Sequence, residues 1–220
     1  MPDLIPHAIF FNPPIFSNFL GHQMAEVYKD CVYAPYVEGK ENLTIIDVGA
    51  NLGVTAYYFS HFGKVFAVEP AAEHFNILTT MIKFNKLDDK IIPINRAIYI
   101  RPAQFELYHN QNRTMWSLHQ ATCDKQGDFE KVEAIPLDQL FEENKIEHCD
   151  LMKVDVEGSE YEIFASEGFA KVAPKIDLII GELHQWANRN PQQIIDSFEQ
   201  NGFSFERIKN DASLFVAKKK

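Results

Sequence analysis

Residues 44–53 read TIIDVGANLG, and this stretch decides what kind of fold the chain can form. Its first half is a short apolar run with one carboxylate, Asp47, near the end, which is typical of a buried strand in a parallel sheet. Gly49 and Gly53 follow, and they permit a tight turn with close approach of the backbone to a ligand. Apolar and aromatic side chains then recur at helical spacing up to residue 62. The stretch predicts a strand, a glycine turn and a helix.

The alternation of strand and helix continues along the chain. Apolar runs predict further strands at residues 64–69, 91–95, 131–135, 150–155 and 176–181, an edge strand at 105–109, and a terminal antiparallel hairpin made by 203–209 and 212–218. Helices are predicted at residues 71–86 and 159–168, from Asp138, and between Asn190 and Gly202, with a loop over 111–127. Strands that alternate with helices predict an α/β fold around a parallel sheet with right-handed crossovers.

The N-terminal segment differs from the rest. Four prolines within residues 1–18 indicate an irregular lead-in, and residues 19–37 show a spacing that predicts a helix. We therefore interpret residues 1–40 as an extension or helical cap and residues 41–220 as one domain. The phenylalanines of the lead-in could cap a pocket or form a homodimer, and the sequence leaves both open.

Composition narrows the partners and the compartment. The chain has 220 residues and a formal net charge of -10, without a basic stripe, so nucleic acid is an unfavourable partner. The three cysteines are scattered, which favours neither a disulfide framework nor a zinc site and fits a reducing compartment. No signal peptide and no apolar run long enough to span a membrane are evident. We expect a cytoplasmic protein without membrane contact.

Acidic residues mark the ends of the first two strands. Ligands of open α/β sheets bind beyond the carboxyl ends of the strands, where Asp47, the glycine turn and Glu69 should meet. A dinucleotide site requires the pattern G-x-G-x-x-G. Counted from Gly49, the second and third glycines would fall at positions 51 and 54, which are Asn51 and Val54 instead. S-adenosylmethionine carries no phosphate and needs an acid, a glycine turn and a second acid for its ribose. Asn95, at the end of the third strand, could contact adenine, or it could be only a polar residue at the point where the chain leaves the sheet.

Three segments carry a family resemblance: DVGANLG (47–53), VFAVEP (65–70) and LMKVDVEGSEYEIF (151–164). Together they resemble the FkbM family of methyltransferases, which is similar to the class I S-adenosylmethionine-dependent enzymes, over residues 40–183. The resemblance implies a Rossmann-like three-layer sandwich with a mostly parallel seven-stranded sheet and an antiparallel last strand. It also implies a cofactor pocket lined by Asp47, Gly49, Asn51, Gly53 and Glu69.

Acidic residues and a histidine follow the fourth and fifth strands of the predicted parallel sheet. Asp155 and Glu157 come after one strand, and Glu182 and His184 come after the other, so we expect the four side chains to converge. Clustered carboxylates and a histidine raise one another's proton affinity, which suits a general base, and His184 is the preferred base. The same set could hold a divalent metal ion, or it could be a hydrogen-bond network that fixes the turns.

Two further signals are weaker. Residues 12–16 read NPPIF and are similar to the motif of amino-methyltransferases, but they precede the cofactor segment, so we interpret them as lead-in. Trp116 and Ser117 lie near Tyr108, His109 and Arg113 in a long loop that could form a lid or a plain surface loop.

These features predict a methyltransferase that uses S-adenosylmethionine and acts on a hydroxyl group of a sugar or natural-product small molecule. Members of the FkbM family methylate such groups, so this acceptor follows from the resemblance. Three alternatives stay open at this point: a methyltransferase of RNA or protein, a non-catalytic cofactor-binding protein, and a nicotinamide-dependent oxidoreductase.

Overall fold

The computed structural model describes residues 21, 23–109, 116–119, 129–184, 189–208 and 213–220. The chain forms two compact units, residues 1–95 and residues 96–220. The predictions for the lead-in with its NPPIF segment and phenylalanines, for Arg113 and for most of the loop 111–127 lie outside the described residues. The predicted boundary at residue 40 stays a prediction.

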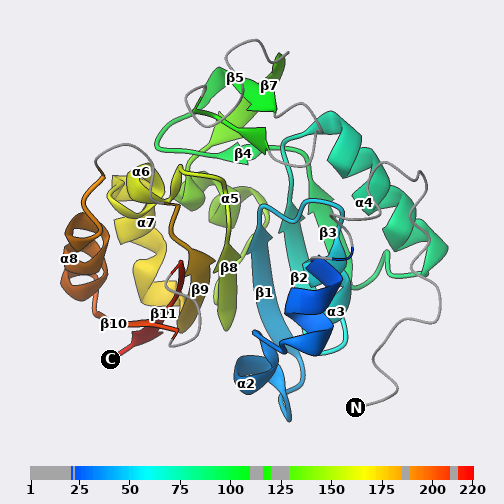
Figure 1. Ribbon diagram of the computed structural model, residues 1–220, viewed down its shortest axis with the longest axis horizontal. Helices are drawn as coiled ribbons and strands as arrows, with labels where there is room; N and C mark the ends of the chain where they lie inside the picture. Colours follow the sequence, from blue (N-terminus) through cyan, green and yellow to red (C-terminus); the bar gives the residue numbers. More distant parts are fainter. Residues whose placement is uncertain (1–20, 22, 110–115, 120–128, 185–188, 209–212) are drawn as a thin grey trace. The chain divides into compact units, whose positions relative to one another are not determined.

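The first unit contains three parallel strands with helices beside them (Figure 1). Its elements are η3 (Ala25–Lys29), α2 (Ala34–Val37), β1 (Leu43–Val48), α3 (Val54–Phe59), β2 (Gly63–Val68), α4 (Ala72–Phe84) and β3 (Ile91–Ile94). In the sheet register, Val65 of β2 lies opposite Ile45 of β1 and Ile91 of β3. The strands and helices predicted between residues 44 and 95 are therefore confirmed, with small differences at their ends.

Burial on both faces explains why these strands are continuous apolar runs. Ile45, Ile46 and Val48 of β1 are at most 1% exposed, although neighbouring side chains of a strand point to opposite faces. Leu78 and Met81 on one side of α4 are equally buried. Polar residues are therefore favoured where a strand leaves the core, and this places the candidate site at the strand ends.

The helix predicted over residues 19–37 is wrong in its second half. The chain forms the π-helix η3, bends, and begins α2 at Ala34. Cys31 has a φ of 53°, a left-handed conformation that a right-handed helix does not accommodate. Pro35 has no N–H to donate to the carbonyl of Cys31, so the helix cannot run through this point.

The second unit contributes the other four strands of the main sheet. Its elements are β4 (Ala97–Ile98), β5 (Ala103–His109), β6 (Trp116–Ser117), β7 (Phe129–Ile135), α5 (Leu137–Glu143), β8 (Leu151–Val154), α6 (Glu160–Phe164), α7 (Glu167–Val172), η5 (Ala173–Lys175), β9 (Leu178–Glu182), α8 (Gln192–Gln200), β10 (Phe203–Arg207) and β11 (Leu214–Lys219). β8 runs parallel to β9, and β11 pairs antiparallel with both β9 and β10. The sheet has seven strands in all and is mostly parallel, which confirms the predicted fold class and the terminal hairpin.

A second sheet, with the order β4-β7-β5-β6, was not predicted. Residues 105–109 were expected to form an edge strand, but β5 pairs with β7 on one side and with β6 on the other. The expectation is wrong because β6 consists of two residues, Trp116 and Ser117, within a segment that has no periodicity. A strand this short leaves no pattern in the sequence.

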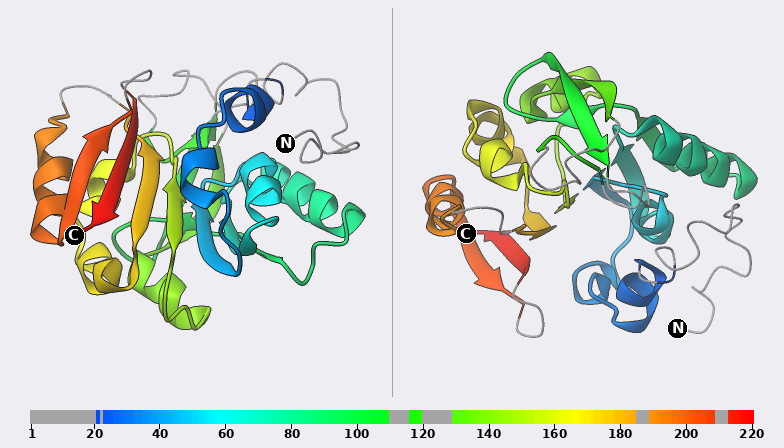
Figure 2. Two further views of the ribbon diagram at one scale, coloured as in Figure 1. Left: turned by 90° about the horizontal axis from the view of Figure 1, so that it is seen from below. Right: turned by 45° about the horizontal axis from the view of Figure 1, so that its top comes forward.

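The helix predicted over residues 159–168 is divided into α6 and α7. The hydroxyl of Ser166 accepts a hydrogen bond of 3.1 Å from the N–H of Phe169 and so begins a new helix. Both helices and α8, which lies beside β10 (Figure 2), pack on a phenylalanine core. Five of its side chains are fully buried: Phe164, Phe169, Phe198, Phe203 and Phe215. Asn190 caps the start of α8 as predicted, since its side-chain oxygen accepts from the N–H of Gln192 at 3.0 Å.

Among the described residues, no helix has the length and apolar character that crossing a membrane requires. Cys31 and Cys149 are free thiols, and Cys123 lies outside the described residues.

Candidate active site

The first unit places a polar residue at the end of each of its strands. Asp47 lies near the end of β1, Glu69 directly follows β2, and Asn95 directly follows β3. Asp47 is fully buried, and the hydroxyl of Thr55 donates to its Oδ2 at 2.5 Å. Because the three strands are parallel, these residues share one edge of the sheet, as predicted.

Glu69 organises the chain around this edge. The residue is 4% exposed, and its carboxylate accepts backbone hydrogen bonds of 2.8 Å from Asn51 and from Ala71. One carboxylate therefore joins the turn after β1 to the start of α4.

The glycine turn uses three left-handed residues. Gly49, Asn51 and Gly53 have φ values of 80°, 51° and 94°. Asparagine tolerates this region better than most residues that carry a Cβ atom, and the side-chain oxygen of Asn51 accepts from the N–H of Leu52 at 2.8 Å. This explains how asparagine can occupy a left-handed turn position that would otherwise favour glycine.

Asn95 holds the end of β2. Its side-chain amide donates to the carbonyl oxygens of Glu69 and Pro70, at 2.9 and 3.0 Å. The structure therefore shows a positioning role, while the predicted contact with adenine stays a prediction.

The hydrogen bonds of the turn indicate which cofactor fits. The N–H groups of Gly49 and Ala50 donate to Val68 O, that of Asn51 to Glu69, that of Leu52 to Asn51, and that of Gly53 to Ala50 O. A pyrophosphate site needs such N–H groups pointing at the ligand. Here all five are bonded within the protein, and a carboxylate stands among them. The turn therefore suits a cofactor without phosphate and with positive charge, which describes S-adenosylmethionine.

The second unit brings the predicted catalytic residues together. Asp155 follows β8, and Glu182 and His184 stand at and after the end of β9. The Nε2 atom of His184 lies 3.2 Å from Glu157 Oε2 and 3.9 Å from Asp155 Oδ1. The expected convergence of these side chains is confirmed, and their catalytic role stays a prediction.

The carboxylates control the charge of His184. Burial by itself would lower the pKa of His184, but hydrogen bonds to Glu157 and Glu160 outweigh it and raise the pKa to about 11. Burial and the charge of Asp155 raise the pKa of Glu157, against the lowering effect of His184, and they also raise the pKa of Glu182. In this arrangement His184 is a cation at neutral pH, and the Glu157 and Glu182 carboxyls bind protons more tightly than usual.

Glu160 completes the cluster and was missed as a site residue. Its side chain is fully buried, and its Oε1 accepts from His184 Nδ1 at 2.9 Å and from the N–H groups of Val156 and Gly158 at 3.1 and 3.3 Å. The sequence signal that could have identified Glu160 is its place in DVEGSE, at the start of a helix. The helix dipole favours an acidic residue at that position. Nothing in the sequence showed that it would reach a residue 24 positions away.

Lys153 and Ser117 also touch this cluster. The ammonium of Lys153, in β8, is nearly buried and lies 3.4 Å from Asp155 Oδ2, which offsets part of the negative charge. The hydroxyl of Ser117 donates to the carbonyl oxygen of Glu157 at 2.7 Å. The sequence placed Ser117 in a lid or a surface loop, and the structure shows it 1% exposed.

A metal ion stays an open alternative for part of this cluster. Asp155, Glu182 and His184 each place one ligand atom within 4.8 Å of the others. However, both ring nitrogens of His184 face carboxylates, so a metal ion would have to displace the proton that now links Nε2 to Glu157.

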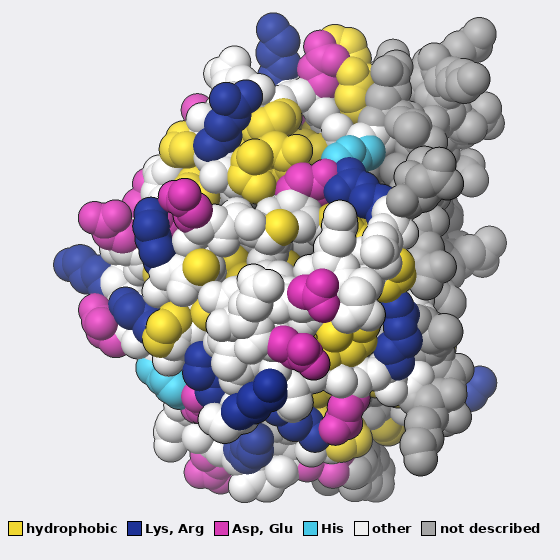
Figure 3. Space-filling view, turned by 90° about the vertical axis from the view of Figure 1, so that its left-hand side faces the viewer, with side chains coloured by type: hydrophobic (Ala, Val, Ile, Leu, Met, Phe, Trp, Pro, Cys, Tyr) yellow, Lys and Arg dark blue, Asp and Glu magenta, His cyan; other side chains and the backbone are white. Residues whose placement is uncertain are grey.

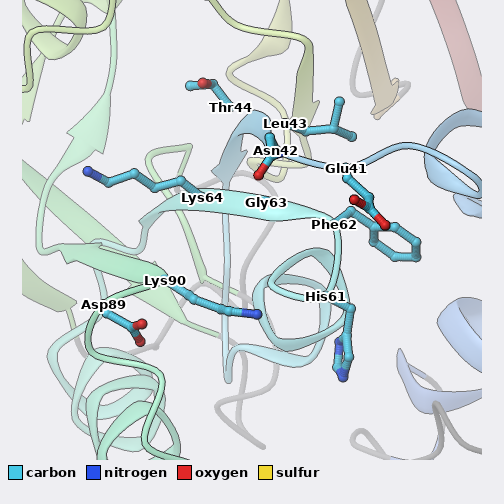
Figure 4. A pocket seen from close by; sticks show the side chains of 10 residues that line it. All are labelled: Glu41, Asn42, Leu43, Thr44, His61, Phe62, Gly63, Lys64, Asp89 and Lys90. Carbon is cyan, nitrogen blue, oxygen red and sulfur yellow. The ribbon is translucent and has the colours of Figure 1, made fainter.

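A cavity of about 450 Å³ lies at the opposite end of the strands in the first unit (Figure 4). It adjoins the amino ends of β1 and β2, and its charged lining residues include Glu41, Lys64 and Lys90. Their side chains point in different directions in Figure 4. Because ligands of such sheets bind at the carboxyl ends, this cavity is not the candidate site.

The fold and the strand-end residues define a class I, Rossmann-like methyltransferase that uses S-adenosylmethionine. The methyltransferase FkbM domain matches residues 47–205, more than half of the chain, and the chain belongs to this family. The predicted resemblance is thereby confirmed.

Individual relatives are distant. The hexuronic acid methyltransferase AglP of Haloferax volcanii is 24% identical over 172 residues, which cover 78% of this chain and 68% of that protein. Magnesium protoporphyrin IX methyltransferase from Synechocystis, solved with bound S-adenosylmethionine, superposes with a TM-score of 0.56 at 10% identity, covering 97% of this chain and 88% of that one. The FkbM methyltransferase from Methylobacillus flagellatus gives a TM-score of 0.53 at 12% identity, covering 94% and 56%. At these identities, the two solved structures show the fold alone.

Proposed function

We propose that the protein transfers a methyl group from S-adenosylmethionine to a hydroxyl group of a saccharide or a related small molecule. The observation that carries the proposal is the pair of Glu157 and His184, joined at 3.2 Å beyond the ends of β8 and β9. The likeness to a hexuronic acid methyltransferase supports a saccharide acceptor.

We assign cofactor binding to the strand-end residues of the first unit: Asp47, Gly49, Asn51, Gly53, Glu69 and Asn95. When bound, S-adenosylmethionine supplies a methyl group on a positively charged sulfur. Glu69, oriented by its two backbone hydrogen bonds, suits the ribose hydroxyls, and the N–H groups of the turn are bonded within the protein rather than to a phosphate site. Asn95 keeps Glu69 in place through the backbone.

The cluster of the second unit supplies the proton acceptor. A hydroxyl is a weak nucleophile, and a positioned base contributes about 10²–10⁴-fold to its reactions. Since the ion-paired His184 already carries a proton, the hydroxyl proton passes to the Glu157 carboxylate, whose pKa is raised. The ion pair with His184 holds the Glu157 side chain in place for this step. His184 as the base itself remains the alternative, and it requires prior loss of the imidazolium proton.

The test is transfer of a labelled methyl group to a panel of neutral sugars, hexuronic acids, an RNA and a protein. Variants Glu157→Gln and His184→Asn are compared with wild type. We expect labelled saccharide from wild type and a loss of turnover of about 10²-fold or more in Glu157→Gln, with cofactor binding retained in both variants.

The linkage of the product sharpens the result. A methyl ether resists mild alkali and identifies a hydroxyl acceptor, whereas an alkali-labile ester identifies a carboxyl acceptor, which is already ionised and needs no base. Label on RNA or protein alone would overturn the proposed acceptor. Figure 3 shows one face on which acidic and basic side chains are interspersed, and a mixed face of this kind does not favour RNA.

A further inference from the structure

We propose that Ser117 is a positioning residue for methyl transfer, because its hydroxyl fixes the peptide group after Glu157 and so holds the Glu157 carboxylate at His184. The inference rests on the proposed function of the Glu157–His184 pair and adds a residue from another sheet to it.

The peptide group between Glu157 and Gly158 is held at both of its polar atoms. Its carbonyl oxygen accepts from Ser117 Oγ at 2.7 Å, and its N–H donates to Glu160 Oε1 at 3.3 Å. Two bonds from opposite sides fix the orientation of a peptide plane. The same Glu160 oxygen accepts from His184, so the clamp and the ion pair share one anchor.

The clamp is needed because the turn is unfavourable by itself. Glu157 has a φ of 54°, which residues with a Cβ atom rarely adopt, and Gly158 follows with a φ of 111°. This conformation aims the Glu157 side chain at His184 Nε2. Without the bond from Ser117, the peptide plane can rotate, and the carboxylate then leaves its place.

The surroundings of Ser117 indicate that its contact with Glu157 is a fixed part of the structure. Ser117 is 1% exposed, and its oxygen also accepts from the N–H of His119 at 3.0 Å. The ring of His119 lies 3.4 Å from Ser159 Oγ and 3.8 Å from Glu162 Oε2, both at the start of α6. The segment 116–119 is thus attached to the DVEGSE turn at more than one point, across 40 positions of sequence.

The test compares Ser117→Ala with Ser117→Thr, which keeps the hydroxyl, and with the control Ser166→Ala. Ser166 makes the same two kinds of bond away from the cluster, donating to Ile163 O at 2.7 Å and accepting from Phe169 N at 3.1 Å. We expect Ser117→Ala to lower kcat by about 10-fold or more, because small misplacements of a reacting group are costly. The KM for S-adenosylmethionine should stay unchanged, Ser117→Thr should recover most of kcat, and Ser166→Ala should retain it.

Ring-nitrogen NMR of His184 at fixed pH gives a readout that does not require an acceptor. Ser117→Ala should shift these resonances, and Ser166→Ala should leave them in place. If wild type methylates no hydroxyl, the proposed function fails and the NMR comparison still decides the positioning role. If Ser117→Ala has the same kcat as wild type and an unchanged His184 spectrum, the inference is wrong.

Discussion

The backbone N–H of Asn51 donates a hydrogen bond of 2.8 Å to the carboxylate of Glu69, and this bond joins the turn after β1 to the end of β2. A negative charge inside a glycine turn distinguishes this site from a phosphate-binding loop of the same outline. The contact therefore links the binding of a phosphate-free cofactor to a single side chain.

Replacement of Glu69 should weaken the cofactor site. In Glu69→Gln, the side chain loses its charge, and an NH2 donor replaces one of the two oxygens that accept from the N–H groups of Asn51 and Ala71. We expect affinity for S-adenosylmethionine to fall about 10-fold or more, about 1.4 kcal/mol, measured by thermal shift or calorimetry. Wild type should be stabilised by about 2.7 kcal/mol at 100 times the dissociation constant, and NAD should have no effect.

A suitable control is Glu41→Gln, because Glu41 is an exposed carboxylate at the other end of the same unit. Equal loss of affinity in both variants, or stabilisation of wild type by NAD, would contradict the assignment of Glu69.

The ion pair of His184 should make stability depend on pH. The pKa of His184 rises from 6.5 to about 11 on folding, so the folded state binds the proton more tightly. Its contribution is complete below about pH 6.5 and is lost as the pH rises toward 11. Urea unfolding between about pH 7 and pH 10 should therefore show a steeper fall in the free energy of unfolding for wild type than for His184→Gln. Parallel slopes for the two proteins would show that no such ion pair forms, and the exposed His148→Gln serves as control.

Turnover should not depend on a divalent metal ion. Both ring nitrogens of His184 are engaged by Glu157 and Glu160, and a metal ion would have to compete with that proton. Activity in the presence of a chelator should equal that of untreated enzyme. Loss of activity that Mg²⁺ or Mn²⁺ restores would instead make Asp155, Glu182 and His184 ligands.

Gly181 should tolerate no larger side chain. A Cβ atom there would lie 2.6 Å from the carbonyl oxygen of Val154 and 2.7 Å from the ring of Phe215. Because Val154 precedes Asp155, a shift of β8 would also disturb the cluster. We expect Gly181→Ala to cost about 1–3 kcal/mol in the free energy of unfolding and to lower turnover. Gly21→Ala, where a Cβ atom would meet nothing within 4 Å, is the control, and equal losses in both variants would contradict the packing argument.

Some of the site was visible in the sequence because its residues follow strands directly. A buried parallel strand has to be apolar, so a carboxylate marks the place where the chain leaves the sheet, as at Glu69 and Asp155. The left-handed turn was visible for the same reason, since Gly49 and Gly53 permit what other residues resist. These are local rules, and the three parallel strands of the first unit confirmed them.

The missed features are of two kinds: breaks with short local signals, and contacts between residues that are distant in the sequence. Three missed features have only short sequence signals: the break at Cys31, the two-residue strand β6 and the division between α6 and α7. The helical or strand periodicity of the neighbouring residues conceals these signals. The high pKa of His184 arises only when Glu157 and Glu160 lie on either side of its ring, out of water.

By itself, the sequence determined the α/β order, the phosphate-free character of the glycine turn and the acids at the strand ends, because each depends on the geometry of a few consecutive residues. Only the tertiary structure decided that Glu160 holds His184 and that Ser117 holds Glu157. Such contacts depend on where two distant segments meet in the folded chain, and no local pattern of residues specifies that.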